Sequence, residues 1–148
     1  EKHSSQLENI LTVVGDNIYS HQELYLKVSP DMYSYEIERL CSTAKKYQVT
    51  GFTTTNTTVN HDPKFIPNSP FKGGASGNAL YNRSLNTQKK FYDIIKGKSL
   101  NPKIIACGGI NSRKKVKERL SYSAESIQIY TPLIFSGPKL LRELKNHI

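Results

Sequence analysis

KIIACGG, at Lys103–Gly109, is a mostly apolar run that ends in two glycines. Near-continuous apolar runs of this length are typical of strands that are buried on both faces of a parallel sheet. Similar short segments lie at 24–28, 49–55 and 126–130, and the second of them is rich in β-branched residues. The sequence therefore predicts four short strands.

Helical patterns alternate with these strands. In 5–17, apolar residues recur at three- and four-residue spacing, as on one face of a helix. Ser34 suits the N-cap of a second helix, whose buried stripe would contain Ile37, Leu40, Cys41, Ala44 and Tyr47. Further helices are expected at 86–96 with Gly97 just past the end, behind the cap Ser112, and behind Gly137-Pro138. One helix followed by four strand–helix units predicts an α/β fold with parallel strands.

Composition limits the classes of function. The chain has 148 residues with 36% apolar content, which suits one globular domain. Its two cysteines and four scattered histidines indicate neither a disulfide framework nor a metal site. There is no run of about twenty apolar residues, so no membrane span is expected. Glu1 is not a natural start, and we expect a fragment or a processed piece.

The net charge of +9 raises the alternative of a basic module that binds nucleic acid or an anionic membrane. The densest basic block is 113–120, where Val116 and Leu120 are four residues apart. This spacing places the basic residues on the outer, solvated face of a helix. No aromatic residues interleave with them, so a nucleic-acid partner is not expected.

Polar and glycine residues follow the strands, where a barrel of parallel strands builds its site. Gly108-Gly109 leaves room for an anion and can turn backbone N–H groups toward it, and Tyr130-Thr131 offers further donors one unit later. The alternative is that the glycines only make a tight turn from strand to helix. The two pairs together predict a phosphate site.

The second strand leads into Thr55-Asn56-Thr57-Thr58. An amide that donates and accepts suits a ring with alternating C=O and N–H groups. The alternative is a threonine-rich edge strand that ends in a turn. Lys27 lies late in the first strand, either at the rim of the interior, where it could stabilise negative charge, or on the outside of the strand.

The segment from Asn56 to about Ser84 is a long loop with three prolines and three glycines, and loops of this length are usually functional or disordered. It contains Gly73-Gly74-Ala75-Ser76-Gly77, which could lie over a flat ligand or act as a flexible linker.

In order, the motifs KVSPD (27–31), TNTT (55–58), GGASG (73–77), IIACGG (104–109) and IQIYT (127–131) resemble the C-terminal half of dihydroorotate dehydrogenases. The forms of TNTT, GGASG and YT resemble the class 2, quinone-linked branch. The resemblance begins at about Leu24. It implies that residues 1–148 form the C-terminal half, about the fifth to eighth strands, of one (β/α)8 barrel domain that holds FMN and oxidises dihydroorotate to orotate.

The resemblance also implies roles for particular residues. Those near FMN would be Lys27, Thr55, Ser76 and Gly77, with Gly108, Gly109, Tyr130 and Thr131 on its phosphate. Those on orotate would be Asn56 and Thr57. The catalytic base, a serine in this class, would lie upstream of Glu1. Three positions depart from the family pattern: Asn78-Ala79 replaces Lys-Pro, Ser123 replaces a glycine, and Pro132 replaces a small residue.

A barrel of this type needs about 250 residues. We therefore expect these 148 residues alone to be inactive, and to expose two sheet edges and an apolar inner face that pair with the N-terminal half of the barrel. Membrane contact would come only through that other region, at the mitochondrial inner membrane if the source is eukaryotic. Another FMN barrel oxidoreductase of dihydropyrimidine type remains the alternative enzyme.

Overall fold

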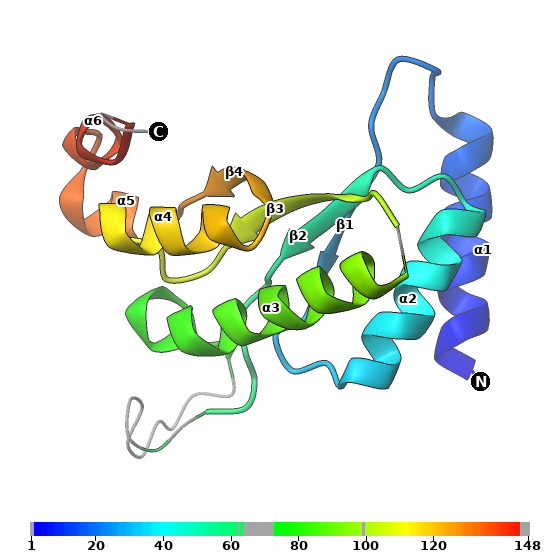
Figure 1. Ribbon diagram of the computed structural model, residues 1–148, viewed down its shortest axis with the longest axis horizontal. Coiled ribbons are helices and arrows are strands. Elements are labelled where there is room, and N and C mark those ends of the chain that lie inside the picture. The colour runs from blue at the N-terminus through cyan, green and yellow to red at the C-terminus, as the bar shows by residue number, and fades with distance from the viewer. Residues whose placement is uncertain (1, 62, 64–72, 99, 146–148) are drawn as a thin grey trace.

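Strands and helices alternate along the chain, in the order that the sequence predicts (Figure 1). The structure is a computed structural model that describes residues 2–61, 63, 73–98 and 100–145. Its strands are β1 (Tyr25–Val28), β2 (Gly51–Thr54), β3 (Lys103–Cys107) and β4 (Ala124–Gln128). Its helices are α1 (Lys2–Asn17), α2 (Ser34–Lys46), the 3-10 helix η1 (Gly77–Leu80), α3 (Tyr81–Gly97), α4 (Arg113–Ser121), α5 (Thr131–Ser136) and α6 (Lys139–Lys145).

The strands form one parallel sheet in the order β1-β2-β3-β4. Val28 pairs with Thr54, and Thr54 pairs with Ala106, so the carboxyl ends of neighbouring strands lie level. Within the described residues, β1 and β4 each have one strand neighbour. The predicted α/β fold is confirmed, and parallel strands that are neighbours both in sequence and in space are the arrangement of a (β/α)8 barrel.

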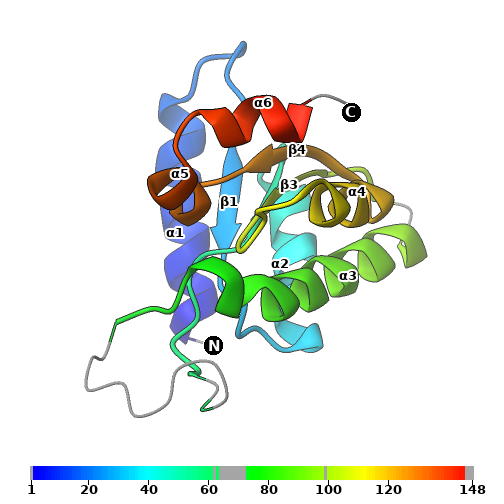
Figure 2. The same cartoon turned by 90° about the vertical axis from the view of Figure 1, so that its left-hand side faces the viewer.

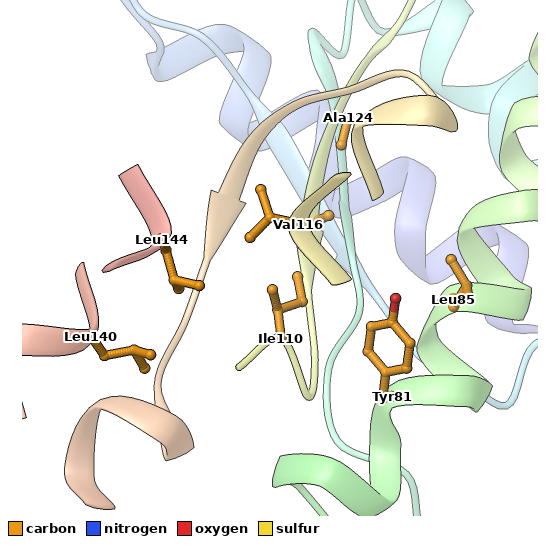
Figure 3. Close-up of a cluster of buried hydrophobic side chains, with 8 residues drawn as sticks. Tyr81, Leu85, Ile110, Val116, Ala124, Leu140 and Leu144 are labelled. Carbon is orange, nitrogen blue, oxygen red and sulfur yellow. The ribbon is translucent and has the colours of Figure 1, made fainter. Parts of the chain in front are cut away.

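Helices α2, α3 and α4 cover one face of the sheet (Figures 1 and 2). A buried cluster joins α2 and α3 to the first three strands; it contains Val28, Ile37, Cys41, Ala44, Phe52, Phe91 and Ile104. The second cluster joins α3, α4 and α6, and Figure 3 shows its Ile110 and Val116 between Tyr81 on one side and Leu140 and Leu144 on the other. Apolar burial, worth about 25 cal/mol per Å², holds the helices on this face.

The opposite face of the sheet is more polar than expected. Because side chains alternate along a strand, Lys27 of β1, Thr53 of β2 and Gln128 of β4 point away from the helices, together with Ile105 of β3. Lys27 and Gln128 are exposed. The prediction of an apolar inner face is therefore wrong for much of this surface, which presents polar groups near the carboxyl ends of the strands.

Several element boundaries differ from the predictions. β4 ends at Gln128, because Gln128 pairs with the last residue of β3, Cys107; the expected strand at 126–130 is therefore displaced by two residues. Helix α5, which the sequence analysis missed, begins directly behind it with Pro132 in its first turn, where a proline is favourable.

Helix α3 begins at Tyr81, before the expected start at 86, and Gly97 is its last residue instead of the residue after its end. Its first turns bury Tyr81, Ser84 and Leu85 at helical spacing, a pattern that the sequence contains. The segment 56–84 is thus not all loop, and residues 62 and 64–72 of it lie outside the described residues.

The helix caps agree in part with the predictions. Ser112 caps α4 as predicted, since its Oγ accepts from the N–H of Lys115. Ser34 is the first residue of α2 and not its cap, which is Tyr33; the N–H of Tyr33 donates to the Glu36 carboxylate at 2.7 Å. The buried stripe of α2 is confirmed for Ile37, Cys41 and Ala44, whereas Leu40 and Tyr47 are half-buried.

Ser123 departs from the family pattern, and the structure gives the reason why a glycine is usual there. It has φ of 58°, in the left-handed region, where α4 turns back into β4. A side chain in this conformation costs about 1–2 kcal/mol.

We expect Ser123→Gly to raise the free energy of unfolding by about 0.5–1 kcal/mol, since relief of this strain exceeds the entropy cost of the glycine. Urea unfolding measures the change. Ser121→Gly, the same substitution in the last turn of α4, is the control and lowers stability, because Ser121 has a helical backbone and its Oγ donates to Glu118 O. Equal effects at both positions would contradict the account.

Candidate functional site

A cavity of about 380 Å³ lies at the carboxyl ends of the strands. The structure brings all ten predicted site residues into its lining: Lys27, Thr55, Asn56, Thr57, Ser76, Gly77, Gly108, Gly109, Tyr130 and Thr131. They come from β1 itself, from the segments behind β2, β3 and β4, and from the glycine-rich loop. Their meeting follows from the parallel register, which places the four strand ends at one edge.

The cavity also has walls to which the sequence analysis assigned no role. They consist of Leu80, Cys107, Ile110, Gln128, Ile129, Pro132 and Ile134. Each lies in, or within a few residues of, a motif named in the sequence analysis. Closeness in sequence was therefore the signal that could have identified these wall residues. The apolar members give the cavity the mixture of apolar wall and few polar groups that is usual for small-molecule sites.

Gly108 and Gly109 have φ of 115° and 67°, a backbone that strongly favours glycine. A Cβ at Gly108 would lie 2.7 Å from Ser84 Oγ, and one at Gly109 would lie 2.6 Å from Gly77 O. The tight strand-to-helix turn is therefore present, and close packing against η1 and α3 requires it. The same two residues line the cavity, so the turn and the predicted anion site are compatible.

Tyr130 does not end a strand, contrary to the prediction. It precedes the first residue of α5, and its side chain is 77% exposed. Thr131 Oγ1 donates to Ser76 Oγ at 3.0 Å, which joins α5 to the glycine-rich loop. Both residues remain on the cavity wall in spite of the shorter strand.

Lys27 lies on the sheet face away from the helices and lines the cavity. Of the two interpretations of its position, the rim of the interior is therefore correct. Its cationic side chain stands on the same wall as Thr55 and Asn56, since β1 and β2 are neighbours.

The segment Thr55–Thr58 continues the hydrogen bonding of the sheet past the end of β2. The N–H of Thr55 donates to Cys107 O at 2.8 Å, and the N–H of Asn56 donates to Val28 O at 2.7 Å. Thr58 then pairs with Ala75, beside Ser76. These bonds place the amide of Asn56 at the cavity and bring the glycine-rich loop against the same segment.

Asp31 anchors this segment, a role that the sequence analysis missed. Its carboxylate accepts from Thr58 Oγ1 at 2.6 Å, from the N–H of Val59 at 3.0 Å and from Arg83 Nη1 at 3.1 Å. Burial alone would raise the pKa of Asp31, but the hydrogen bonds from Thr58 and Val59 and the Arg83 charge outweigh it and lower the pKa.

Arg119 corrects the prediction for the basic helix. It was expected on a solvated face, yet its side chain is 0% exposed. It lies three residues after the buried Val116, so helical spacing already placed the two on one face. Burial lowers the pKa of the guanidinium to about 10, and it remains protonated at neutral pH.

Among the described residues, no group of three or more His, Cys, Asp and Glu side chains gathers in a way that could hold a metal ion. Cys41 and Cys107 are both free, and burial raises the pKa of the Cys41 thiol to about 11. No helix in the described part of the chain is long and apolar enough to cross a bilayer.

A parallel sheet with flanking helices and a cavity at its carboxyl edge defines an α/β protein of the barrel type. A family model described as dihydroorotate dehydrogenase matches residues 2–148. The chain belongs to the dihydroorotate dehydrogenase family.

Curated relatives carry the name dihydroorotate dehydrogenase (quinone). That of Haemophilus influenzae (strain PittEE) is 30% identical over 138 residues, which are 93% of this chain and 40% of the relative. That of Shewanella sediminis is 36% identical over 120 residues, which are 80% of this chain and 34% of the relative. The chain thus spans about two fifths or less of the length of these relatives.

Solved structures have the same fold. The crystal structure of DHODH from Eimeria tenella in complex with ferulenol has a TM-score of 0.74 and 28% identity, covering 84% of this chain and 32% of that chain. The ligand-free type from the same organism has a TM-score of 0.80 over 97% of this chain and 44% of that chain, at 24% identity. The sheet and its helices therefore correspond to part of a barrel of this family.

The Asp31 anchor makes stability depend on pH. The folded-state pKa lies below the ordinary value of about 3.9, so the stabilisation is present above about pH 4 and is lost as the pH falls through the folded pKa. We expect Asp31→Asn to lower the free energy of unfolding by about 1–3 kcal/mol at pH 7, and by progressively less below pH 4.

Denaturant unfolding between pH 7 and 3.5 checks this expectation. Asp93→Asn, at an exposed position of α3, is the matched control and leaves stability within about 0.5 kcal/mol. A deficit for Asp31→Asn that stays constant with pH would contradict the anchoring role.

Proposed function

We propose that the protein that contains this chain oxidises dihydroorotate to orotate with FMN as cofactor and a quinone as electron acceptor. The observation that carries the proposal is the single cavity in which the ten predicted residues meet. Family membership and the names of the quinone-linked relatives support the choice of substrate and acceptor.

The residues present fit FMN. Gly108 and Gly109 both have positive φ and line one wall of the cavity. Their backbone suits an anionic phosphate. Apolar walls of Ile110, Ile129 and Ile134 suit a ribityl chain and a flat ring. FMN supplies the redox chemistry when bound, since it takes up two electrons from the substrate and passes them on.

The chain itself supplies placement and charge. Lys27 lines the cavity, where its cation would stabilise negative charge on the flavin ring system. The amide of Asn56 and the hydroxyl of Thr57 donate to and accept from the polar edge of orotate. The bonds of Asp31 to Thr58 and Val59 hold these two residues in place, which reduces the entropy lost on binding.

By family resemblance, the residue that removes the substrate proton is a serine outside this chain, supplied by the N-terminal half of the barrel. The chain contributes the phosphate end and one side of the orotate site.

Asn56→Ala in the intact protein tests the substrate assignment. We expect the KM for dihydroorotate to rise at least about tenfold while the flavin content stays unchanged, because about 1.5–3 kcal/mol of hydrogen bonding to a charged ligand is lost. Asn60→Ala, the same change at an exposed position outside the cavity, is the control and changes neither quantity.

The measurement is a steady-state assay with dihydroorotate and a soluble quinone. Absence of dihydroorotate oxidation by the flavin-loaded wild-type protein would sink the proposed function. A normal KM in Asn56→Ala would remove Asn56 from the substrate site.

A further inference from the structure

Arg119 is a charged side chain in the interior, 0% exposed, and its acceptors are all neutral. Nη1 donates to Gln88 Oε1 at 2.9 Å, while Nη2 donates to Ser84 Oγ at 2.8 Å and to Gly108 O at 3.0 Å. Burying a charge is expensive unless it is paired or hydrogen-bonded. A neutral side chain of similar size would fill the same space. The presence of a buried charge at this position therefore needs a physical explanation.

The turn after β3 supplies a reason, because side chains of α3 and α4 donate hydrogen bonds to its carbonyls. Arg119 donates to the carbonyl of Gly108. Lys115, one turn earlier on α4, donates from Nζ to Gly109 O at 3.0 Å. Ser84 Oγ in turn donates to Cys107 O. Three successive carbonyls of this turn are therefore fixed by side chains of α3 and α4.

A trans peptide group is planar, and its N–H points opposite to its C=O. Because the carbonyls of Gly108 and Gly109 point toward the cations of α4, the N–H groups of Gly109 and Ile110 point away from them. Gly109 and Ile110 both line the cavity. The two cations thus orient backbone donors while leaving the glycine wall of the cavity free of side chains, and their charge lies just behind that wall.

We propose that Arg119, assisted by Lys115, is a positioning residue for anion binding: it fixes the Gly108-Gly109 turn and adds positive potential behind it, so that the cavity selects a phosphate-bearing flavin. The proposal rests on the proposed function, because the anion is the phosphate of FMN. Neither residue lines the cavity, so both act through the backbone.

A comparison of FMN with riboflavin separates this role from a merely structural one, because riboflavin lacks the phosphate. In the intact apoprotein, Arg119→Met and Lys115→Met are expected to weaken FMN binding about tenfold and riboflavin binding by less than about twofold. The dissociation constants are measured by quenching of flavin fluorescence. Lys115 is half-buried and tolerates substitution, so it decides the question if Arg119→Met does not fold.

Each variant has a matched control. Gln88→Leu removes an equally buried partner of Arg119 that has no bond to Gly108, and Lys114→Met removes an exposed neighbour on α4. Both are expected to keep the wild-type ratio of the two constants. Parallel weakening of both flavins in Arg119→Met and Lys115→Met, or the same loss of selectivity in the controls, overturns the inference alone. Failure of the wild type to bind either flavin overturns the proposed function and this inference with it.

Discussion

The parallel, in-register pairing of four short strands is the constraint on which the rest of the structure depends. It brings the segments after β1, β2, β3 and β4 to one edge, although they are far apart in sequence. Cys107 O, at that edge, accepts from the N–H of Thr55 and from Ser84 Oγ. The same atom therefore ties the segment Thr55–Thr58 and α3 to the end of β3.

The strands, the helices and the cavity wall could be predicted from the sequence because each depends on local chemistry. Apolar periodicity located the strands and helices, and polar or glycine residues behind strands located the cavity wall. The predictions failed where pairing between strands, and not the local sequence, sets the end of an element. The end of β4 is set by its pairing with Cys107, and Ala124 and Glu125 have little strand propensity of their own. Tyr130 was accordingly assigned to a strand, and α5 was missed.

The two residues that anchor the site from outside the cavity, Asp31 and Arg119, could not be predicted for a different reason. Asp31 contacts Arg83 across 52 residues of sequence, and Arg119 contacts Ser84 across 35, so no local pattern pairs them. The basic residues of α4 were predicted to lie on a solvated face, and the spacing of Arg119 from Val116 was overlooked. Both anchors bind backbone or hydroxyl groups next to cavity residues. The site is thus held by residues outside the cavity, while the cavity wall contains mostly glycine, threonine and apolar side chains.

The central claim is that this edge of the sheet binds a flavin that dihydroorotate reduces. The most direct test is the visible spectrum of the intact protein before and after anaerobic addition of dihydroorotate. The account predicts a bound flavin whose visible absorbance is bleached by the substrate. A flavin that stays oxidised would contradict the substrate, and a colourless protein that does not take up added FMN would contradict the assignment of the cavity.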